Sequence, residues 1–291
     1  MSVAIIDYGS GNLHSAAKAF ERAARAIVRF ERREAQLVTG GTFADWPLVG
    51  LTQIAPINRR LDPAAGLFGL AIVNRVGVLA DPANRAAIAQ AFDRAAFTAT
   101  ISPDWAPVSQ LLPEQLDSAA PPAIPAWAQT ENGTAEDPAA RIARWKTTHP
   151  GEITIRVALP DGPGANLLYG YVGAALVSLG IVPERVAAEA PADLRLIDAV
   201  APYDSGRWYV ATACQLCSEA TQTAIDAARD ADSPRMRAQQ IAIADAALAS
   251  EVAFIPIARP LRWSLVSIRL KAWTGNSRAW HPLNHLRSDT N

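Results

Sequence analysis

Cysteine is scarce in this sequence, whose 291 residues include only Cys214 and Cys217. Two cysteines are too few for a disulfide-rich scaffold or for a four-cysteine zinc site. Lysine is scarce as well, at Lys18, Lys146 and Lys271, and 27 basic residues face 28 acidic ones, for a net charge of −1. Because no basic surplus is present to neutralise a phosphate backbone, we expect no nucleic-acid partner.

Long hydrophobic runs are nearly absent. The candidate for a membrane span is the uncharged stretch 165–183, but Gly180 is expected to end its helix near Leu179, short of the ~20 residues that a span needs. Pro183 and the charged Glu184 follow directly, so we predict a buried helix and then a strand. The opening MSVAIIDYGSGN lacks the basic segment of a signal peptide, and the chain as written is expected to stay in the cytoplasm.

Familiar catalytic motifs are missing too. Neither G-x-S-x-G nor G-x-C-x-G occurs, so there is no nucleophile elbow. Gly9 and Gly11 match the first two glycines of the dinucleotide-binding motif G-x-G-x-x-G, but His14 stands at the position of the third glycine. His281 and His285 are separated by Pro282 and are not expected to share a helical face, which argues against a metal site. We therefore expect no enzyme activity, no cofactor and no bound metal.

The two cysteines form a C-x-x-C pair just before the helix expected from Ser218. A redox site could use this position, because the N-terminus of a helix lowers a thiol pKa. The chain is not of thioredoxin size, however, and no tryptophan stands immediately before Cys214. The sequence favours two thiols that are buried or line a cleft.

The residues that are present indicate an α/β protein. Half of them are hydrophobic and 19 % are charged, which is typical of a folded chain with a large core. Apolar periodicity predicts strands at 3–6, 36–43, 67–73, 153–159, 254–257 and 263–268. It predicts helices at 13–25, 82–97, 165–179, 218–229 and 233–252. Seven prolines exclude long helices and central strands from the stretch 102–138.

Tryptophan is abundant, with eight residues. Its flat apolar face and polar edge suit a ligand cleft, but ordinary core packing is equally consistent with this composition. Arg262 precedes Trp263, and a structural role for its guanidinium group would be to stack on an indole ring.

The first 25 residues carry a specific resemblance. The run IDYGSGNL resembles the N-terminus of the glutaminase subunit of imidazole glycerol phosphate synthase. The resemblance implies a strand, a turn and a helix, and an amidotransferase role in histidine synthesis is the alternative function. That family needs a cysteine nucleophile in an elbow and a P-G-V-G oxyanion segment, and this sequence contains neither.

A second resemblance covers residues 29–287. The blocks LADPANRAAIAQAFDRAAF (79–97), FIPIARPLRWSLVSIRLKAW (254–273) and HPLNHLR (281–287), with the strand–GPG–helix at 155–180, occur in the order seen in one family. They resemble the C-terminal half of the solute-binding proteins of peptide- and nickel-type ABC transporters (family 5).

This second resemblance implies a fold and a function. The fold would be α/β, a mixed-sheet lobe of the type II periplasmic-binding-protein fold with an incomplete first lobe. Residues 1–25 would be the glutaminase-like segment, 26–150 a remnant of the first lobe or an inter-lobe segment, and 151–291 the second lobe with the C-terminal segment. The function would be non-catalytic binding of a peptide-like solute, with an ABC permease as membrane partner and the periplasm as location.

The same resemblance implies candidate ligand-binding residues. Asp204 and Trp208 align with the family's "W..Dy.dp" run, and the loop from Cys214 to Cys217 stands where an acidic pair would be. A buried ammonium group without a carboxylate partner is costly, so a neutral or different ligand is favoured over a peptide with a free amine. We expect Asp204, Trp208, Cys214 and Cys217 to contact the ligand.

Overall fold

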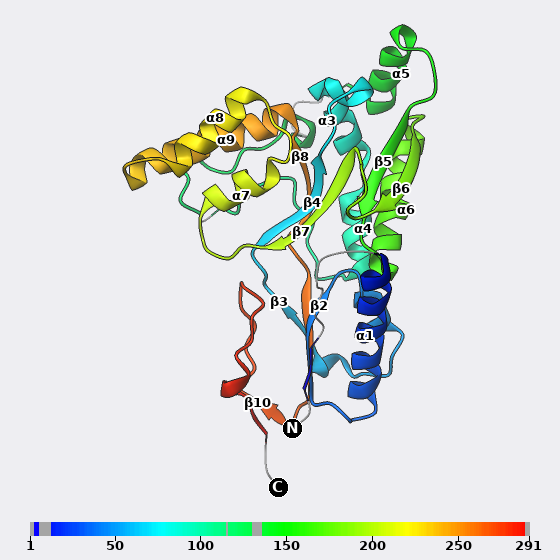
Figure 1. The fold of residues 1–291 in the computed structure, drawn as a ribbon, viewed down its shortest axis with the longest axis vertical. Helices are drawn as coiled ribbons and strands as arrows, with labels where there is room; N and C mark the ends of the chain where they lie inside the picture. The colour runs from blue at the N-terminus through cyan, green and yellow to red at the C-terminus, as the bar shows by residue number, and fades with distance from the viewer. Residues whose placement is uncertain (1–2, 6–12, 115, 130–135, 289–291) are drawn as a thin grey trace.

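The computed structural model describes residues 3–5, 13–114, 116–129 and 136–288. It contains two main β-sheets, one of four strands and one of five, and a two-stranded ribbon near the C-terminus. Figure 1 shows the two sheets one above the other, each with its own helices. The turn expected at residues 7–12 lies outside the described residues.

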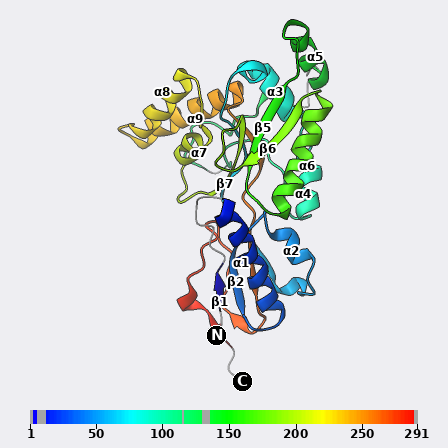
Figure 2. The same ribbon diagram turned by 45° about the vertical axis from the view of Figure 1, so that its right-hand side comes forward.

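The four-stranded sheet forms the smaller unit, here called the small lobe. Its strand order is β1-β2-β9-β3, with β1 and β2 parallel and the other pairs antiparallel. The strands are β1 (Val3–Ile5), β2 (Leu37–Thr42), β3 (Arg59–Asp62) and β9 (Arg262–Val266). The helices α1 (Leu13–Glu31) and α2 (Trp46–Gly50) belong to this lobe, and α1 lies along the sheet (Figure 2).

The five-stranded sheet forms the large lobe, which holds residues 66–258. Its order is β6-β5-β7-β4-β8, with β5 parallel to β6 and β7, and β4 antiparallel to β7 and β8. The strands are β4 (Gly66–Ile72), β5 (Thr154–Leu159), β6 (Val182–Ala187), β7 (Leu194–Val200) and β8 (Phe254–Ala258). The mixed sheet confirms the predicted fold class, and Pro256 lies in an edge strand as its missing N–H requires.

Helices cover both faces of the large sheet (Figure 1). One face carries α3 (Pro82–Ala91), α4 (Arg94–Ile101), α5 (Pro138–Thr148) and α6 (Pro163–Ser178); the other carries α7 (Gly206–Ala213), α8 (Glu219–Arg229) and α9 (Pro234–Glu251). Successive side chains of β4 point to opposite faces of this sheet. Phe68 and Leu70 enter the larger apolar core, and Leu67 and Ala71 enter the core under α7–α9. Short 3-10 turns occur at Pro56–Asn58 (η1), Gly77–Ala80 (η2), Ala126–Ala128 (η3) and Leu283–His285 (η4).

The chain passes between the two sheets at residues 63–65 and again at 259–261. The small lobe is therefore assembled from both ends of the chain, and the large lobe is one continuous stretch. The segment boundaries at 25/26 and 150/151 do not coincide with these crossings. These boundaries divide the chain by the family that each segment resembles, and this division of the chain stays a prediction.

Most of the helices expected from the sequence are present, with two differences. The first helix continues beyond Arg25 to Glu31, because the buried Ala26, Ile27 and Phe30 extend its apolar stripe through the charged segment. The single helix expected at 82–97 is two helices, because Asp93 accepts a hydrogen bond from the backbone N–H of Ala96 and starts α4.

The uncharged stretch after residue 163 forms α6, which is followed by the strand β6 as predicted. Gly180 has a φ of +70°, the left-handed conformation in which glycine commonly ends a helix. Within the described ranges, no helix combines the length and the apolar character that crossing a bilayer requires.

The C-terminal residues 270–288, here called the C-terminal arm, fold back on the small lobe. Strands β10 (Leu270–Lys271) and β11 (Arg287–Ser288) pair antiparallel. The carboxylate of Asp62, at the end of β3, contacts His281 Nε2 at 3.0 Å and accepts the backbone N–H of Asn276 at 3.0 Å. These contacts hold the arm beside the first crossing between the lobes.

Candidate functional site

The two lobes contact one another directly at the corner between β2 and α2. The backbone N–H of Gly164, in the first turn of α6, donates a 2.9 Å hydrogen bond to the carbonyl oxygen of Ala44. A Cβ atom at Gly164 would overlap the carbonyl oxygen of Phe43, and Gly162 has a φ of +129°. The Gly162-Pro-Gly164 turn therefore lets the backbones of the two lobes meet.

Phe43 anchors this contact. Its side chain is 1 % exposed and meets the ring of Phe68, in β4, edge to face at a centroid distance of 4.7 Å. Phe68 in turn contacts Trp105 at 4.9 Å and stacks parallel to Phe97 at 6.3 Å. A side chain of the small lobe thus completes an aromatic cluster of the large lobe, so that one apolar core continues across both.

Beside this corner, the lobes line a cavity of about 510 Å³ that is open to solvent, here called the junction cavity. Parts of both lobes and of the C-terminal arm line it. Its lining residues are Gly40, Thr42, Phe43, Ala44, Asp45, Pro160, Asp161, Ala188, Leu196, Asp198, Val200, Arg262, Arg278 and Ala279. Its size and its mixture of apolar walls and a few polar groups are typical of a small-molecule site.

An ion pair between the lobes forms part of the cavity wall. Arg262, at the start of β9, places Nη1 2.7 Å from a carboxylate oxygen of Asp198 in β7, and Nη2 donates to the Asp198 carbonyl oxygen. Burial raises the pKa of Asp198, and the guanidinium group of Arg262 offsets part of that rise. The suggested stacking of Arg262 on Trp263 is wrong, because successive side chains of a strand point to opposite faces and Trp263 is buried in the core.

A second guanidinium group reaches the cavity from the C-terminal arm. Arg278 donates to the carbonyl oxygen of Ala201 at 2.8 Å and forms an ion pair with Asp204 at 2.5 Å. Both partners follow β7 in the large lobe, so Arg278 ties the arm to that lobe.

Asp45 is the most unusual group in the wall. Its side chain is 1 % exposed, and the hydroxyl of Thr42 donates to it at 3.4 Å. Burial raises its pKa to about 7, since the charged carboxylate loses its hydration. A buried carboxyl group with so strongly shifted a pKa, placed in a cavity, marks a candidate functional residue.

None of the four residues expected to contact the ligand is among the described residues that line the junction cavity. Asp204 is an exposed partner of the lining residue Arg278. Trp208 lines a separate groove between α7 and α8, together with Tyr203, Arg207 and others. The assignment of Asp204, Trp208, Cys214 and Cys217 as ligand-binding residues stays a prediction.

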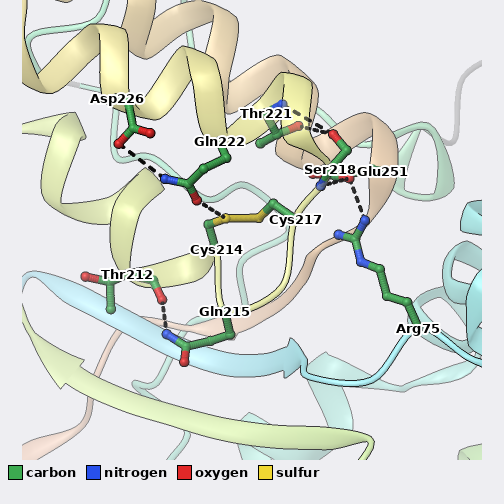
Figure 3. Close-up of a disulfide and its surroundings, with 10 residues drawn as sticks. All are labelled: Arg75, Thr212, Cys214, Gln215, Cys217, Ser218, Thr221, Gln222, Asp226 and Glu251. Atoms are coloured by element: carbon green, nitrogen blue, oxygen red, sulfur yellow. Dashed lines mark hydrogen bonds and ion pairs between the residues drawn. A yellow bond between two sulfur atoms is a disulfide. The ribbon is translucent and has the colours of Figure 1, made fainter.

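The cysteines are joined to each other, which corrects the expectation of free thiols. Cys214 and Cys217 form a disulfide at the junction of α7 and α8, with an S–S distance of 2.04 Å (Figure 3). Gln222 lies within 3.6 Å of the Cys214 sulfur, and its amide donates to Asp226. On the other side of the loop, the carboxylate of Glu251 accepts the backbone N–H of Ser218. Spacing alone left the pairing open, and only the fold brings the two sulfur atoms together.

Removing this disulfide is expected to destabilise the protein moderately. In the chain-entropy account, the double variant Cys214→Ser/Cys217→Ser should lose about 2 kcal/mol of unfolding free energy, because the closed loop is short. Urea unfolding with and without reductant measures the loss. The matched control is Leu216→Ser, which alters the same exposed loop and keeps the bond. Thiols in the unreduced protein that react with an alkylating reagent would contradict the assignment.

Sequence reasoning missed the polar groups of the junction cavity. Asp45, Asp198 and Arg278 lie in three separate segments, and no motif connects them. A usable local signal was the Asp-Gly-Pro-Gly turn from Asp161 to Gly164, which was correctly placed before a helix. Among the described residues, no three His, Cys, Asp or Glu side chains gather closely enough to hold a metal ion.

Solved structures with the same arrangement are solute-binding proteins. Haemophilus influenzae OppA in complex with the peptide RPPGFSPFR matches with a TM-score of 0.73 and 12 % identity, over 92 % of this chain and 57 % of that one. The Escherichia coli murein tripeptide binding protein MppA matches with a TM-score of 0.73 and 13 % identity, over 91 % and 56 %. NikZ from Campylobacter jejuni, in complex with Ni(L-His), matches with a TM-score of 0.65 and 15 % identity, over 88 % and 56 %.

These matches show that the chain has the type II periplasmic-binding-protein fold over about nine tenths of its length, as predicted. The chain spans 56–57 % of the length of these three proteins. No family model matches the sequence.

Curated relatives match a different and shorter part. The imidazole glycerol phosphate synthase subunit HisH of Rhodopseudomonas palustris is 74 % identical over 39 residues, which is 13 % of this chain and 17 % of that protein. HisH of Bradyrhizobium diazoefficiens is 46 % identical over 87 residues, 28 % of this chain and 38 % of that protein. Both alignments are longer than the 25 residues on which the sequence resemblance rests, and both cover well under half of the enzyme subunit.

Proposed function

We propose that this chain binds a small solute for an ABC importer and catalyses no reaction. The observation that carries the proposal is the junction cavity, which is walled by both lobes of a fold shared with solute-binding proteins. Of the three neighbours described above, OppA is in complex with a peptide, MppA is a murein tripeptide binding protein, and NikZ is in complex with Ni(L-His). A membrane permease would be the partner to which the solute is delivered.

We place the working protein in the periplasm. Structural disulfides persist in oxidising compartments, and the Cys214–Cys217 bond fits that environment better than the reducing cytoplasm. The fold of the chain supports the same location, because its structural neighbours include periplasmic proteins.

The alternative function is glutamine hydrolysis in histidine synthesis, and the HisH alignments favour it for the opening segment. Hydrolysis by this family would require a free cysteine nucleophile in an elbow. Both cysteines of this chain are joined in a disulfide far along the sequence from that segment. We therefore assign the HisH-like residues a structural role, in which β1 adds a parallel strand beside β2.

Solute binding predicts a ligand-dependent rise in the melting temperature. A solute present at about 100 times its Kd stabilises the folded state by about 2.7 kcal/mol, because it binds that state alone. Thermal-shift screening with dipeptides, oligopeptides and their neutral and amine fragments measures this effect.

A matched pair of variants locates the binding site. Ala188→Trp fills the junction cavity and should abolish the shift, whereas Ala187→Trp, on the exposed neighbouring residue, should keep it. Glutaminase turnover by the purified protein, or a shift that survives Ala188→Trp, would contradict the proposal.

A further inference from the structure

The two lobes carry opposite net charges. The small-lobe segments 13–62 and 262–288 contain 13 basic and 5 acidic residues, a net charge of +8. The segment 63–261 between them contains 14 basic and 21 acidic residues, a net charge of −7. The near-neutral charge of the whole chain therefore conceals a strong asymmetry, and an anionic surface attracts the small lobe while it repels the large lobe.

The end of the small lobe that faces away from the large lobe contains a pocket of about 460 Å³, here called the distal pocket. Strands β2 and β9 reach the junction cavity with Thr42 and Arg262, so the opposite ends of both strands lie at this far end (Figure 1). Residues of the segments 30–36, 53–58 and 267–269 line the distal pocket. It is therefore separate from the space between the lobes.

Three arginines at this end lack a counter-charge within the protein. Arg33 and Arg269 line the distal pocket, and Arg32 precedes Arg33 in the chain. Within the described ranges, none of these three exposed guanidinium groups forms an ion pair or a hydrogen bond. Glu31 also lines the pocket, and its carboxylate accepts the backbone N–H of Gln53 at 2.7 Å. The arginines can therefore bind an external phosphate group, whose oxygens match the paired N–H donors of a guanidinium.

Exposed apolar side chains accompany these arginines. Ile268 lines the distal pocket and is 62 % exposed, and Ile57, in the η1 turn beside the pocket, is exposed to the same extent. The buried Phe30 and Ile54 give the pocket an apolar wall. Basic side chains next to exposed apolar ones are typical of protein surfaces that lie at the boundary between lipid headgroups and acyl chains.

We propose that the distal end of the small lobe binds the surface of a membrane that contains anionic phospholipids. Arg33 and Arg269 contact the lipid phosphate groups, and Ile57 and Ile268 enter the boundary between headgroups and acyl chains. The large lobe, with its net charge of −7, points away from the membrane. This interaction goes beyond solute binding, because it requires no solute and leaves the junction cavity at the other end of the small lobe free.

The exposed isoleucines favour a bilayer over a nucleic acid as the anionic partner. A nucleic acid offers phosphate groups but no apolar phase, so Ile57 and Ile268 would gain nothing from it. A bilayer satisfies both kinds of side chain at once, because its headgroups are charged and its interior is apolar.

Co-sedimentation of the full chain with lipid vesicles tests the proposal. The chain should bind vesicles of phosphatidylglycerol and phosphatidylcholine in a ratio of about 1:2, and it should bind pure phosphatidylcholine at least about tenfold more weakly. Raising NaCl from about 0.05 M to about 0.5 M should weaken the binding to the anionic vesicles about tenfold, because salt screens exposed charges. Equal binding to both kinds of vesicle overturns the proposal.

Charge-neutralising variants locate the lipid-binding surface. Arg33→Gln and Arg269→Gln should each weaken binding to the anionic vesicles about fivefold, and the double variant about twenty-fivefold. The matched control Arg235→Gln makes the same charge change at an exposed residue of α9 in the large lobe, and it should bind like wild type. Unchanged binding by the double variant, or equal losses in Arg235→Gln and Arg33→Gln, overturns the proposal.

An apolar variant distinguishes a bilayer from other polyanions. Ile268→Ser should weaken vesicle binding about tenfold, because the side chain no longer enters the apolar region. The matched control Ile243→Ser, at a residue of the large lobe that is 54 % exposed, should keep wild-type binding. Binding to a DNA duplex that is tighter than binding to the anionic vesicles and unaffected by Ile268→Ser would identify a general polyanion site and overturn the proposal.

Discussion

Replacing Phe43 with alanine is expected to lower the free energy of unfolding by about 3–5 kcal/mol, the range seen when a fully buried aromatic side chain is truncated. Phe43 is 1 % exposed and belongs to the small lobe, but its ring packs on Phe68 in the large lobe. The variant should therefore also loosen the contact between the lobes. Denaturant unfolding measures the first effect, and faster proteolysis at the 63–65 crossing measures the second.

Two further variants control for composition and surface effects. Phe43→Leu keeps most of the buried volume and should cost about 1.5 kcal/mol or less. Ile57→Ala removes an apolar side chain that is 62 % exposed and should change stability little. If Phe43→Ala proved as stable as Ile57→Ala, Phe43 would not anchor the two lobes as described.

Arg262→Ala should have an effect of similar size for an electrostatic reason. Removing one partner of a buried ion pair typically costs about 3–5 kcal/mol, because the other charge stays buried without compensation. Here the remaining charge is Asp198, whose side chain is 15 % exposed. Chemical unfolding at neutral pH measures the loss.

The pH dependence of this variant has a definite sign. Burial raises the pKa of Asp198 even beside Arg262, and removing the guanidinium group raises that pKa further. A raised folded-state pKa means that the stability contribution is complete below the ordinary pKa of aspartate and is lost as pH rises through the folded value. Arg262→Ala should therefore approach wild-type stability as the pH falls toward 4, and its deficit should grow toward neutral pH.

The neutral double variant Asp198→Asn/Arg262→Gln separates charge from shape. It keeps side chains of similar size and leaves no uncompensated charge, so it should recover much of the stability lost in Arg262→Ala. If Arg262→Ala lost less than about 1 kcal/mol of unfolding free energy, the Arg262–Asp198 pair would contribute no more than an exposed surface ion pair does. That result would contradict the description of this pair as buried between the lobes.

Local features of the sequence predicted individual elements well. The helix predicted at 233–252 is α9, and at its start the hydroxyl of Ser233 accepts the backbone N–H of Met236 at 3.2 Å. The uncharged run ended by Gly180 predicted the buried helix α6. These signals depend on residues within one or two turns of each other, which explains why they could be read without the fold.

Signals that depend on distant partners could not be read in the same way. The helix expected at 82–97 is divided at Asp93, whose side chain caps the start of α4. The free-energy difference between one continuous helix and two capped helices amounts to only a few hydrogen bonds. Arg262 was placed on Trp263, its neighbour in sequence, whereas its partner Asp198 is 64 positions away in another lobe. The junction cavity was not foreseen, because its walls come from both ends and the middle of the chain.

The sequence alone determined the α/β class, most of the element positions and the resemblance to solute-binding proteins, because composition, apolar period and motif order are properties of contiguous residues. Only the tertiary structure decided which elements form each lobe, that the cysteines are joined, and that the buried Asp45 lies in a cavity wall. The physical reason is that burial and charge pairing depend on which surfaces meet, and here Gly164 and Phe43 bring two lobes together across more than a hundred residues.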